Sequence, residues 1–244
     1  MSGKEKIAKL GKPSMIFGLG QQRRLDLIKK YADLKGKRIL DIGCGIGMYS
    51  QKFKGEGAEV FGIDIDKKNI ERAKKLDSLV NFLCSSAEKT PFEDNFFDIV
   101  FLNEVLEHVK DDKKALKEAL RVVRPRGKII IFAPNRLFPF ETHGIYLFNR
   151  YIYRNFPFVN WLPGALRNYF CPHVRVYFSG ALKKLLEGSK ADFVLVDYIW
   201  PGFDKIKSRH RALAKIFIGM RSFAEKNKAL KKFGISIFAI IQKT

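Results

Sequence analysis

The sequence predicts an α/β protein built on a mostly parallel β-sheet. Short apolar runs with β character alternate with helical stretches along residues 36–133, a pattern typical of parallel sheets whose strands are joined by helices. The first of these runs ends in a glycine-rich turn. The chain has 244 residues, of which 46% are hydrophobic, so it is long enough to bury one complete core. We therefore expect one α/β domain.

The first predicted strand, residues 38–42, leads into three glycines at alternate positions: Gly43, Gly45 and Gly47. Glycine lets a chain turn tightly and approach a ligand closely, and the helix that follows directs its N-terminal amides to the same place. The turn therefore predicts a nucleotide-like ligand. The dinucleotide fingerprint Gly-x-Gly-x-x-Gly would require a glycine where Met48 stands, so the spacing differs from that fingerprint.

The next strands also end in polar residues that fit a ligand. The apolar run 60–63 ends in Asp64, about twenty residues after the first glycine, where a carboxylate can accept hydrogen bonds from both hydroxyls of a ribose. Asp66 is better interpreted as the N-cap of the following helix. The later run 98–102 opens into Asn103. Because ligands of open α/β sheets bind at the carboxyl ends of the strands, Asp64 and Asn103 are site candidates.

These features, in their order and spacing, resemble the class I methyltransferases that use S-adenosylmethionine. The similar stretches are Asp41–Gly47 (motif I), Val80–Glu88 (adenine site), Asn103–Val109 (motif IV) and Leu120–Gly127 (the turn before the fifth strand). The resemblance implies a Rossmann-like, seven-stranded sheet that is mostly parallel with its last strand antiparallel, helices on both faces, and a lid insertion. It also implies an enzyme that converts S-adenosylmethionine to S-adenosylhomocysteine by direct displacement at the sulfonium methyl.

The resemblance places cofactor-binding residues at matching positions of this chain. They are Asp41, Gly43, Gly45, Gly47, Tyr49, Asp64, Ile65, Ser86, Ala87 and Asn103. Where the family commonly has an aspartate before Ala-Glu, this chain has Ser86, so the adenine contact would be an uncharged hydrogen bond. Tyr49 either closes over the methionine portion or packs on the sheet. We expect His108 to be a packed or surface histidine.

Residues 134–178 form an insertion that we expect to cover the substrate. It holds 13 of the 32 aromatic residues, and its Lys and Arg residues are all arginines, in a chain otherwise rich in lysine. Arginine suits planar, stacked or bidentate recognition. The expected substrate contacts are Arg136, His173 and Arg175.

Glu141 and His143, within this insertion, are the catalytic candidates. A histidine of near-neutral pKa suits removal of a hydroxyl proton during methyl transfer, and the glutamate would orient it. Two alternatives stay open: the pair clamps the substrate, or it bonds loop backbone and holds the shape of the lid. We expect no metal site, and only this pair leaves that question open.

The charge of the chain is its strongest compositional feature. Its 46 basic and 25 acidic residues give a formal net charge of +21, which attracts nucleic acid, anionic lipid or phosphorylated substrates. Ten Lys or Arg and a single acid lie between residues 205 and 232, where apolar residues recur at helical spacing. We expect a basic amphipathic helix there. It either packs one face and solvates the other, or lies on an anionic membrane or RNA.

We expect a single methyltransferase domain over residues 1–244. Its segments would be an N-terminal helical segment (1–35), the cofactor-binding core (36–133), the lid (134–178) and the C-terminal half of the sheet with the basic helix (179–244). Three cysteines without metal-type spacing, and no apolar run approaching twenty residues, indicate a cytoplasmic protein. Peripheral contact with a membrane stays open.

The function we expect is methylation of a small-molecule or lipid-linked acceptor, with oxygen favoured as the attacked atom. A tRNA or rRNA methyltransferase is the first alternative. The charge favours it, but the chain lacks both a separate RNA-binding domain and the Asn/Asp-Pro-Pro-Tyr motif of many amino-directed enzymes. The second alternative, a non-catalytic protein that binds S-adenosylmethionine, is disfavoured because the motifs are complete except at Ser86.

Overall fold

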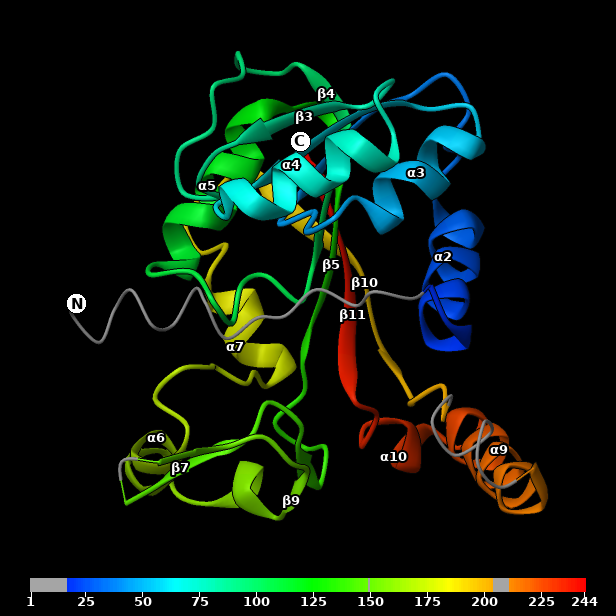
Figure 1. Ribbon diagram of the computed structural model, residues 1–244, viewed down its shortest axis with the longest axis vertical. Helices are drawn as coiled ribbons and strands as arrows, with labels where there is room; N and C mark the ends of the chain where they lie inside the picture. The colour runs from blue at the N-terminus through cyan, green and yellow to red at the C-terminus, as the bar shows by residue number, and fades with distance from the viewer. Residues whose placement is uncertain (1–16, 149, 204–210) are drawn as a thin grey trace.

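The computed structural model describes residues 17–148, 150–203 and 211–244. Its centre is a seven-stranded sheet with the order β10-β11-β5-β4-β1-β2-β3 (Figure 1). The strands are β1 (Arg38–Ile42), β2 (Glu59–Asp64), β3 (Asn81–Cys84), β4 (Phe97–Asn103), β5 (Val123–Pro134), β10 (Ala191–Ile199) and β11 (Ser236–Lys243). Only β11 runs antiparallel to its neighbours, β5 and β10. The predicted Rossmann-like sheet is therefore confirmed, including the antiparallel last strand.

Helices cover both faces of the sheet and bury a separate core against each. One core joins the strands to α5 (Asp112–Val122) and α7 (Ser179–Lys184). The opposite core joins them to α2 (Leu19–Tyr31), α3 (Met48–Gly55) and α4 (Lys67–Leu76). Parallel strands covered on both faces read as continuous apolar runs, which is why the central strands are recognisable in the sequence.

Two of these helices begin at aspartates that cap them. The side chain of Asp66 accepts a hydrogen bond from the backbone N–H of Lys68 at the start of α4, which confirms the predicted N-cap. Asp111 does the same for α5 through the N–H of Lys114. Both caps follow short loops after strands, so they fix where each helix leaves the sheet.

The lid (residues 134–178) extends from the end of β5 and forms the lower left part of the molecule in Figure 1. It has little regular structure. Its elements are β6 (Phe140–Glu141), β7 (Ile145–Leu147), β8 (Arg150–Ile152), β9 (Phe156–Pro157), the 3₁₀ helix η1 (Val159–Trp161) and α6 (Gly164–Phe170). β6 pairs with β9, and β7 pairs with β8, both antiparallel. The lid is thus two short ribbons and a helix, held together mainly by side chains.

The basic C-terminal region differs from the single helix expected over 205–232. The structure has α9 (Arg211–Lys226) and α10 (Lys228–Lys231), separated at Asn227. The Asn227 side chain accepts hydrogen bonds from the N–H groups of Ala229 and Leu230, so it caps a new helix instead of continuing the first. Residues 205–210 of the expected helix, and residues 1–16 of the N-terminal segment, lie outside the described residues.

None of the helices in the described part of the chain combines the length and the apolar character needed to cross a bilayer.

Candidate functional site

The carboxyl ends of β4, β1 and β2 lie side by side and bring the predicted cofactor residues together. Strand order reverses between β1 and β4, and the crevice at such a reversal is where open α/β sheets bind ligands. The loop that follows β1 holds the three glycines, Asp64 ends β2, and Asn103 ends β4. We call this edge of the sheet the cofactor edge.

The glycine loop adopts a backbone that other residues would strain. Gly43 and Gly47 have φ angles of +68° and +83°. A Cβ atom on Gly43 would lie 2.5 Å from a methyl of Val105, and one on Gly47 would lie 2.5 Å from the ring of Phe82. Glycine is therefore required at both positions for close packing and for the left-handed turn.

Asp64 is fixed in place by the loops around it. Its Oδ2 accepts a hydrogen bond from the N–H of Gly45 at 2.9 Å, and its Oδ1 accepts one from the N–H of Asp66 at 2.8 Å. The next residue, Ile65, is 57% exposed beside it. A carboxylate oriented by backbone amides, next to an exposed apolar side chain, suits a ribose and the adjoining face of a base.

Asp41 lies under the glycine loop. Its side chain is buried and accepts a hydrogen bond of 2.6 Å from the hydroxyl of Ser50. Burial raises the pKa of Asp41 to about 7. This hydrogen bond joins the Asp41 side chain of β1 to α3. A direct role of Asp41 in cofactor binding stays a prediction.

The predicted adenine stretch follows β3 at the same edge. Ser86 Oγ accepts a hydrogen bond from the N–H of Glu88 at 3.1 Å, which closes a tight turn. Ser86 and Ala87 are both half-buried, and Ala87 packs on the core that contains α5. The turn is rigid and partly open, so both residues stay candidates for the adenine contact.

Tyr49 does not fit the predicted contact with the cofactor. Its ring is 8% exposed and packs against Phe53 and Phe101, with centroid distances of 6.0 and 5.1 Å. Burial is also the main reason its pKa is raised. Tyr49 lies on the side of α3 that faces β4. Of the two roles expected for it, closing over the cofactor or packing on the sheet, the structure shows packing on the sheet.

Arg24 was not identified from the sequence, yet it organises the end of β4. Its guanidinium donates hydrogen bonds to Oδ1 of Asn103 and to Oε1 of Glu104, the latter at 2.7 Å, and Ser236 Oγ also donates to Glu104. Burial alone would raise the pKa of Glu104, but the charge of Arg24 lowers it to about 2. Asn103 is thereby held at the cofactor edge by α2.

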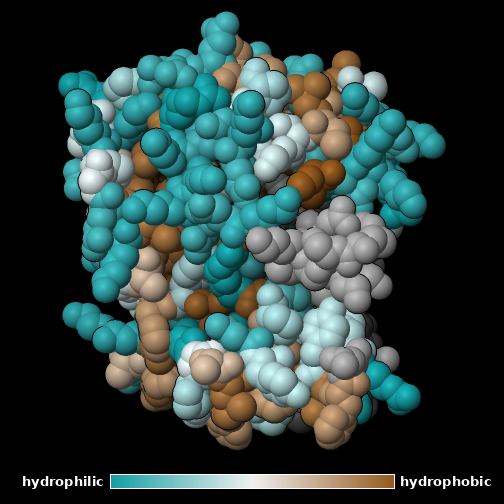
Figure 2. Space-filling model, turned by 90° about the vertical axis from the view of Figure 1, so that its left-hand side faces the viewer, coloured by the Kyte–Doolittle hydropathy of each residue, from teal (hydrophilic) through white to brown (hydrophobic). Residues whose placement is uncertain are grey.

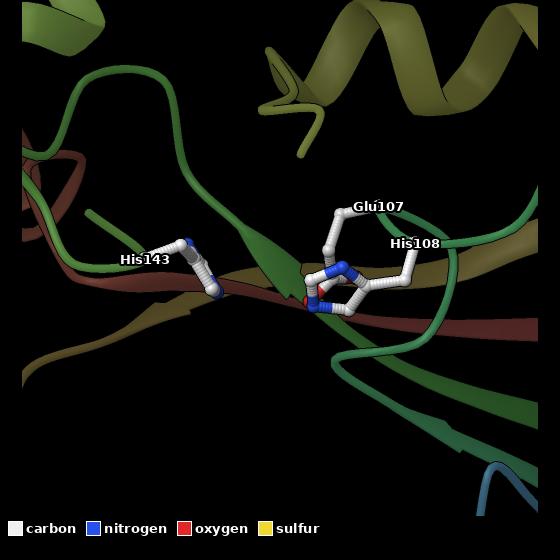
Figure 3. A group of neighbouring side chains, drawn as sticks. All are labelled: Glu107, His108 and His143. Carbon is white, nitrogen blue, oxygen red and sulfur yellow. The ribbon is translucent and has the colours of Figure 1, made fainter. Parts of the chain in front are cut away.

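A second polar group lies where the turn after β4 meets the lid. Figure 3 shows Glu107 and His108 converging with His143, which comes from the lid. One ligand atom from each residue lies within 4.8 Å of the others. Glu107 is 1% exposed, and neither of its carboxylate oxygens has a hydrogen-bond partner among the described residues. This group was not expected, and His108 is part of it.

The environment of this group favours uncharged forms. Burial raises the pKa of Glu107 well above its usual range, and the neighbouring negative charge of Glu104 acts in the same direction. Burial, followed by the nearby His143, lowers the pKa of His108 to about 4. A buried acid without a hydrogen-bond partner is costly, so such a group in a native fold points to a ligand or a proton-transfer role.

His143 is oriented by Glu141, as the sequence suggested. Glu141 Oε1 lies 2.9 Å from His143 Nδ1 and also accepts a hydrogen bond from the N–H of His143. The other oxygen, Oε2, accepts a hydrogen bond of 2.6 Å from Arg167. Burial raises the pKa of Glu141, but the bond from His143 and the charge of Arg167 outweigh it and lower that pKa to about 2.

This arrangement separates the roles of the two residues. A carboxylate only accepts hydrogen bonds, so Nδ1 of His143 carries a hydrogen and Nε2 is the basic nitrogen of the neutral ring. Glu141 is therefore the orienting group rather than the base. The His143 ring lies beside Glu107 and His108, with one of its nitrogens within 4.8 Å of a ligand atom of each.

The three predicted substrate contacts have different environments. Arg136 lines a cavity in the lid and donates a hydrogen bond to the carbonyl of Leu162. His173 is buried, and its Nε2 lies 3.2 Å from the carbonyl of His143. Arg175 donates to the carbonyls of Leu106, Val109 and Lys110. Arg175 therefore holds the turn after β4, and its expected contact with the substrate stays a prediction.

Comparison with known proteins agrees with the geometry of the cofactor edge. The sequence model of a family described as "Methyltransferase domain" matches residues 40–131. The solved S-adenosylmethionine-dependent methyltransferases of Mesorhizobium loti and Aquifex aeolicus superimpose with TM-scores of 0.63 and 0.56. They are 17% and 18% identical, covering 93% and 99% of this chain and 100% and 98% of theirs. Residues 40–131 therefore match a methyltransferase domain, and the chain shares the fold of solved S-adenosylmethionine-dependent methyltransferases.

Curated proteins similar to this chain include methyltransferases named for quinones. A ubiquinone biosynthesis O-methyltransferase of Coxiella burnetii is 34% identical over 134 residues, which cover 52% of this chain and 57% of that protein. A demethylmenaquinone methyltransferase of Renibacterium salmoninarum is 28% identical over 172 residues, 69% of each chain. The chain thus spans little more than half the length of the ubiquinone O-methyltransferases that it matches.

S-Adenosylmethionine, the cofactor of this family, fits the cofactor edge. The glycine loop has no room for side chains, and the Asp64 carboxylate is already oriented at its mouth. Next to the cofactor edge, the methyltransferase also offers one carboxylate and two imidazoles, from Glu107, His108 and His143, with ligand atoms close enough to hold a divalent cation. The pattern Glu104-Val-Leu-Glu107-His108 was the available sequence signal for this group.

Proposed function

We propose that this methyltransferase transfers the methyl group of S-adenosylmethionine to an oxygen of a small, quinone-type phenolic acceptor. The observation that carries the proposal is His143, whose ring Glu141 orients beside the buried group of Glu107 and His108. The relatives named for ubiquinone and demethylmenaquinone support the acceptor class. A phenol needs to lose its proton as it is methylated, and His143 is the side chain placed to receive it.

The chemistry divides between the cofactor and the protein. The sulfonium methyl is already activated, so the protein contributes binding, orientation and removal of one proton. The acceptor oxygen forms its bond to the methyl carbon as the carbon–sulfur bond breaks, which leaves S-adenosylhomocysteine. The phenolic proton passes to His143 Nε2, and the negative charge of Glu141 stabilises the imidazolium that results.

A divalent cation bound by the same group is the alternative to His143 as the base. Held by Glu107, His108 and His143, it would lower the pKa of an acceptor hydroxyl by Lewis acidity. In that case His143 would serve as ligand rather than base. Titration with Mn²⁺ and Zn²⁺ distinguishes the two roles: saturable binding that Glu107→Gln weakens at least tenfold supports the cation, and its absence leaves His143 as the base.

The surface of the lid and of α9 supports a lipid-linked acceptor. In Figure 2 apolar side chains gather over the lower part of the molecule, where the lid lies, while hydrophilic side chains dominate above. On α9, Ile216, Met220 and Phe223 are each about 60% exposed beside lysines, and Figure 1 shows α9 at the same end as the lid. An apolar and basic end suits contact with an anionic membrane surface.

Two measurements test the proposal. Isothermal titration with S-adenosylhomocysteine should show binding that Asp64→Ala weakens, and a panel of catechols and hydroquinones should include an acceptor that the protein methylates on oxygen. Failure of cofactor binding contradicts the proposal as a whole, whereas binding without methylation of any phenol contradicts the acceptor class.

Membrane contact and the RNA alternative are separated by salt. Vesicles containing phosphatidylglycerol should retain the protein from about 0.1 M to about 0.5 M salt, because insertion of apolar side chains is weakly screened. Phosphate contacts to RNA weaken steeply over the same range. Binding to RNA that exceeds vesicle binding, with methyl transfer to it, would favour an RNA methyltransferase, the function that the net charge of +21 supports.

A further inference from the structure

The lid and the turn before β11 line an open cavity that the proposed methyl transfer does not use. Its volume is about 570 Å³, within the range of ligand-binding pockets. Apart from Arg136 and Asn160 its lining is apolar. The lining residues are Arg136, Leu137, Asn160, Trp161, Leu162, Pro163, Phe178 and Phe233. We call it the Arg136 cavity.

Arg136 gives this apolar cavity a single positive charge. Its guanidinium lies 5.5 Å from the centre of the Phe178 ring and donates one hydrogen bond, of 2.7 Å, to the carbonyl of Leu162. No carboxylate of the described residues forms an ion pair with it. A guanidinium has five N–H groups, so donors are left for an anion.

The aromatic walls of the cavity suit an alkyl chain. Trp161 lies against Phe233 with a centroid distance of 6.4 Å, and its indole N–H is already bonded to the carbonyl of Leu137. The indole therefore offers its ring rather than a donor to the cavity. A cavity with apolar walls and one unpaired cation is complementary to a molecule with an apolar chain and one acidic group.

A buried network connects a wall of the cavity to His143. Asn160 is 3% exposed, and its Oδ1 accepts a hydrogen bond of 3.3 Å from Nε of Arg167. Arg167 donates to Glu141 at 2.6 Å, and Glu141 holds His143. Because these groups are buried and fill one another's hydrogen-bonding needs, movement of Asn160 requires the others to adjust.

We propose that the Arg136 cavity binds a single-chain anionic amphiphile, with its acidic group on Arg136 and its chain on the aromatic walls. We propose further that its binding changes the position of the His143 ring through Asn160, Arg167 and Glu141. This goes beyond the proposed function, since binding requires neither the cofactor nor a methyl acceptor. The acidic group is a carboxylate or a phosphate, since the planar guanidinium of Arg136 can donate paired hydrogen bonds to either.

Tryptophan fluorescence tests the binding site. The chain has two tryptophans, so the Trp200→Phe variant reports on Trp161 alone. Dodecanoate and dodecyl phosphate, below their micellar concentrations, should each change its emission saturably with one molecule bound per chain; the arm that binds tighter identifies the acidic group. Dodecyltrimethylammonium, with the same chain and opposite charge, should bind at least tenfold more weakly.

A matched pair of arginine variants separates the site from general attraction to a basic protein. Arg136→Gln should weaken dodecanoate binding at least tenfold, because it removes the one cation of the cavity. Arg154→Gln changes the same charge at an exposed position of the lid and should alter the affinity less than twofold. No saturable signal, or equal weakening by both variants, overturns the site.

The coupling to His143 has its own readout. The chain contains four histidines, so the ring resonances are few and His143→Gln assigns the one in question. Saturating dodecanoate should shift the His143 resonance, and an unmoved resonance overturns the coupling while leaving the site intact. Binding of S-adenosylhomocysteine by the same samples tests the proposed function separately, because it depends on the cofactor edge.

Discussion

The cofactor edge and the lid hold their polar groups by different means. At the cofactor edge, backbone groups position the side chains. The N–H of Gly45 orients the Asp64 carboxylate, and glycines with positive φ angles shape the loop beside it. In the lid, one buried guanidinium positions them. Arg167 donates hydrogen bonds to the side chains of Glu141 and Asn160 and to the carbonyl of Val174. Backbone-built sites tolerate most side-chain changes, whereas a site that depends on one buried charge does not.

Replacement of His143 should have the largest effect, and it should affect turnover but not cofactor binding. We expect His143→Ala to reduce turnover of the phenolic acceptor by roughly 10²- to 10⁴-fold, the usual contribution of a positioned base. The affinity for S-adenosylhomocysteine should stay within about twofold, because the cofactor edge does not depend on the lid side chain. Steady-state rates and isothermal titration on one preparation measure both.

His173→Gln is the control for that experiment. His173 lies in the same lid and touches the carbonyl of His143, but its Nδ1 has no hydrogen-bond partner among the described residues. We expect a much smaller loss of turnover from it. Equal losses from the two variants would mean that His143 only maintains the shape of the lid, the alternative that the sequence left open.

Removal of the Arg167 charge should loosen the lid without unfolding the sheet. Arg167→Met leaves the Glu141 carboxylate buried with one partner fewer, and breaking a buried ion pair in this way costs about 3–5 kcal/mol. Hydrogen exchange of lid amides should accelerate, while amides of the central strands and the affinity for S-adenosylhomocysteine change little. Arg154→Met, at an exposed site, should do neither; protection of the lid retained in Arg167→Met would contradict its central role.

The same contrast explains what the sequence could reveal. The cofactor edge depends on local patterns, such as glycines at alternate positions and an acid at the end of an apolar run, and these patterns predicted the loop after β1 and the end of β2. Arg24 and Arg167 act on partners far along the chain: Glu104 lies 80 residues from Arg24, and Glu141 lies 26 residues from Arg167. Local sequence periodicity does not reveal such a distant ion pair, so the structural role of neither arginine was predicted.

Where the structure adds to or differs from the sequence predictions, the causes are equally local. The sequence could not say which side of α3 carries Tyr49 toward the sheet, and the ring is buried there. It also gave no sign that Asn227 would cap a new helix within a stretch of helical periodicity. Arg175 was predicted to contact the substrate because the lid is rich in arginine. In the structure its guanidinium donates hydrogen bonds to three backbone carbonyls.

Asp41, at the cofactor edge, should contribute to the pH dependence of the free energy of unfolding between about pH 4 and 7. Burial raises the pKa of Asp41 from 3.8 to about 7. Between about pH 4 and 7 the folded protein therefore keeps on Asp41 a proton that the unfolded chain has already lost. Stability therefore falls across that window and levels off above pH 7. Asp41→Asn, which can still accept the hydrogen bond from Ser50, should remove this loss.

Urea unfolding at two pH values measures the effect. A shift of about three pKa units corresponds to at most about 4 kcal/mol at pH 8, and to almost nothing at pH 4. We expect Asp41→Asn to be more stable than the wild type at pH 8, relative to pH 4. A difference that is the same at both pH values would contradict the raised pKa.

The smallest effect should come from restoring the acid that the family commonly carries before Ala-Glu. Ser86→Asp keeps an acceptor for the N–H of Glu88 and replaces a neutral acceptor toward adenine with a charged one. Hydrogen bonds to charged groups exceed neutral ones by about 1 kcal/mol, so the affinity for S-adenosylhomocysteine should rise about fivefold. Ser85→Asp, one position earlier, should leave the affinity unchanged. If both variants bind equally, Ser86 does not contact the adenine, and the cofactor edge recognises its ligand through the glycine loop and Asp64 alone.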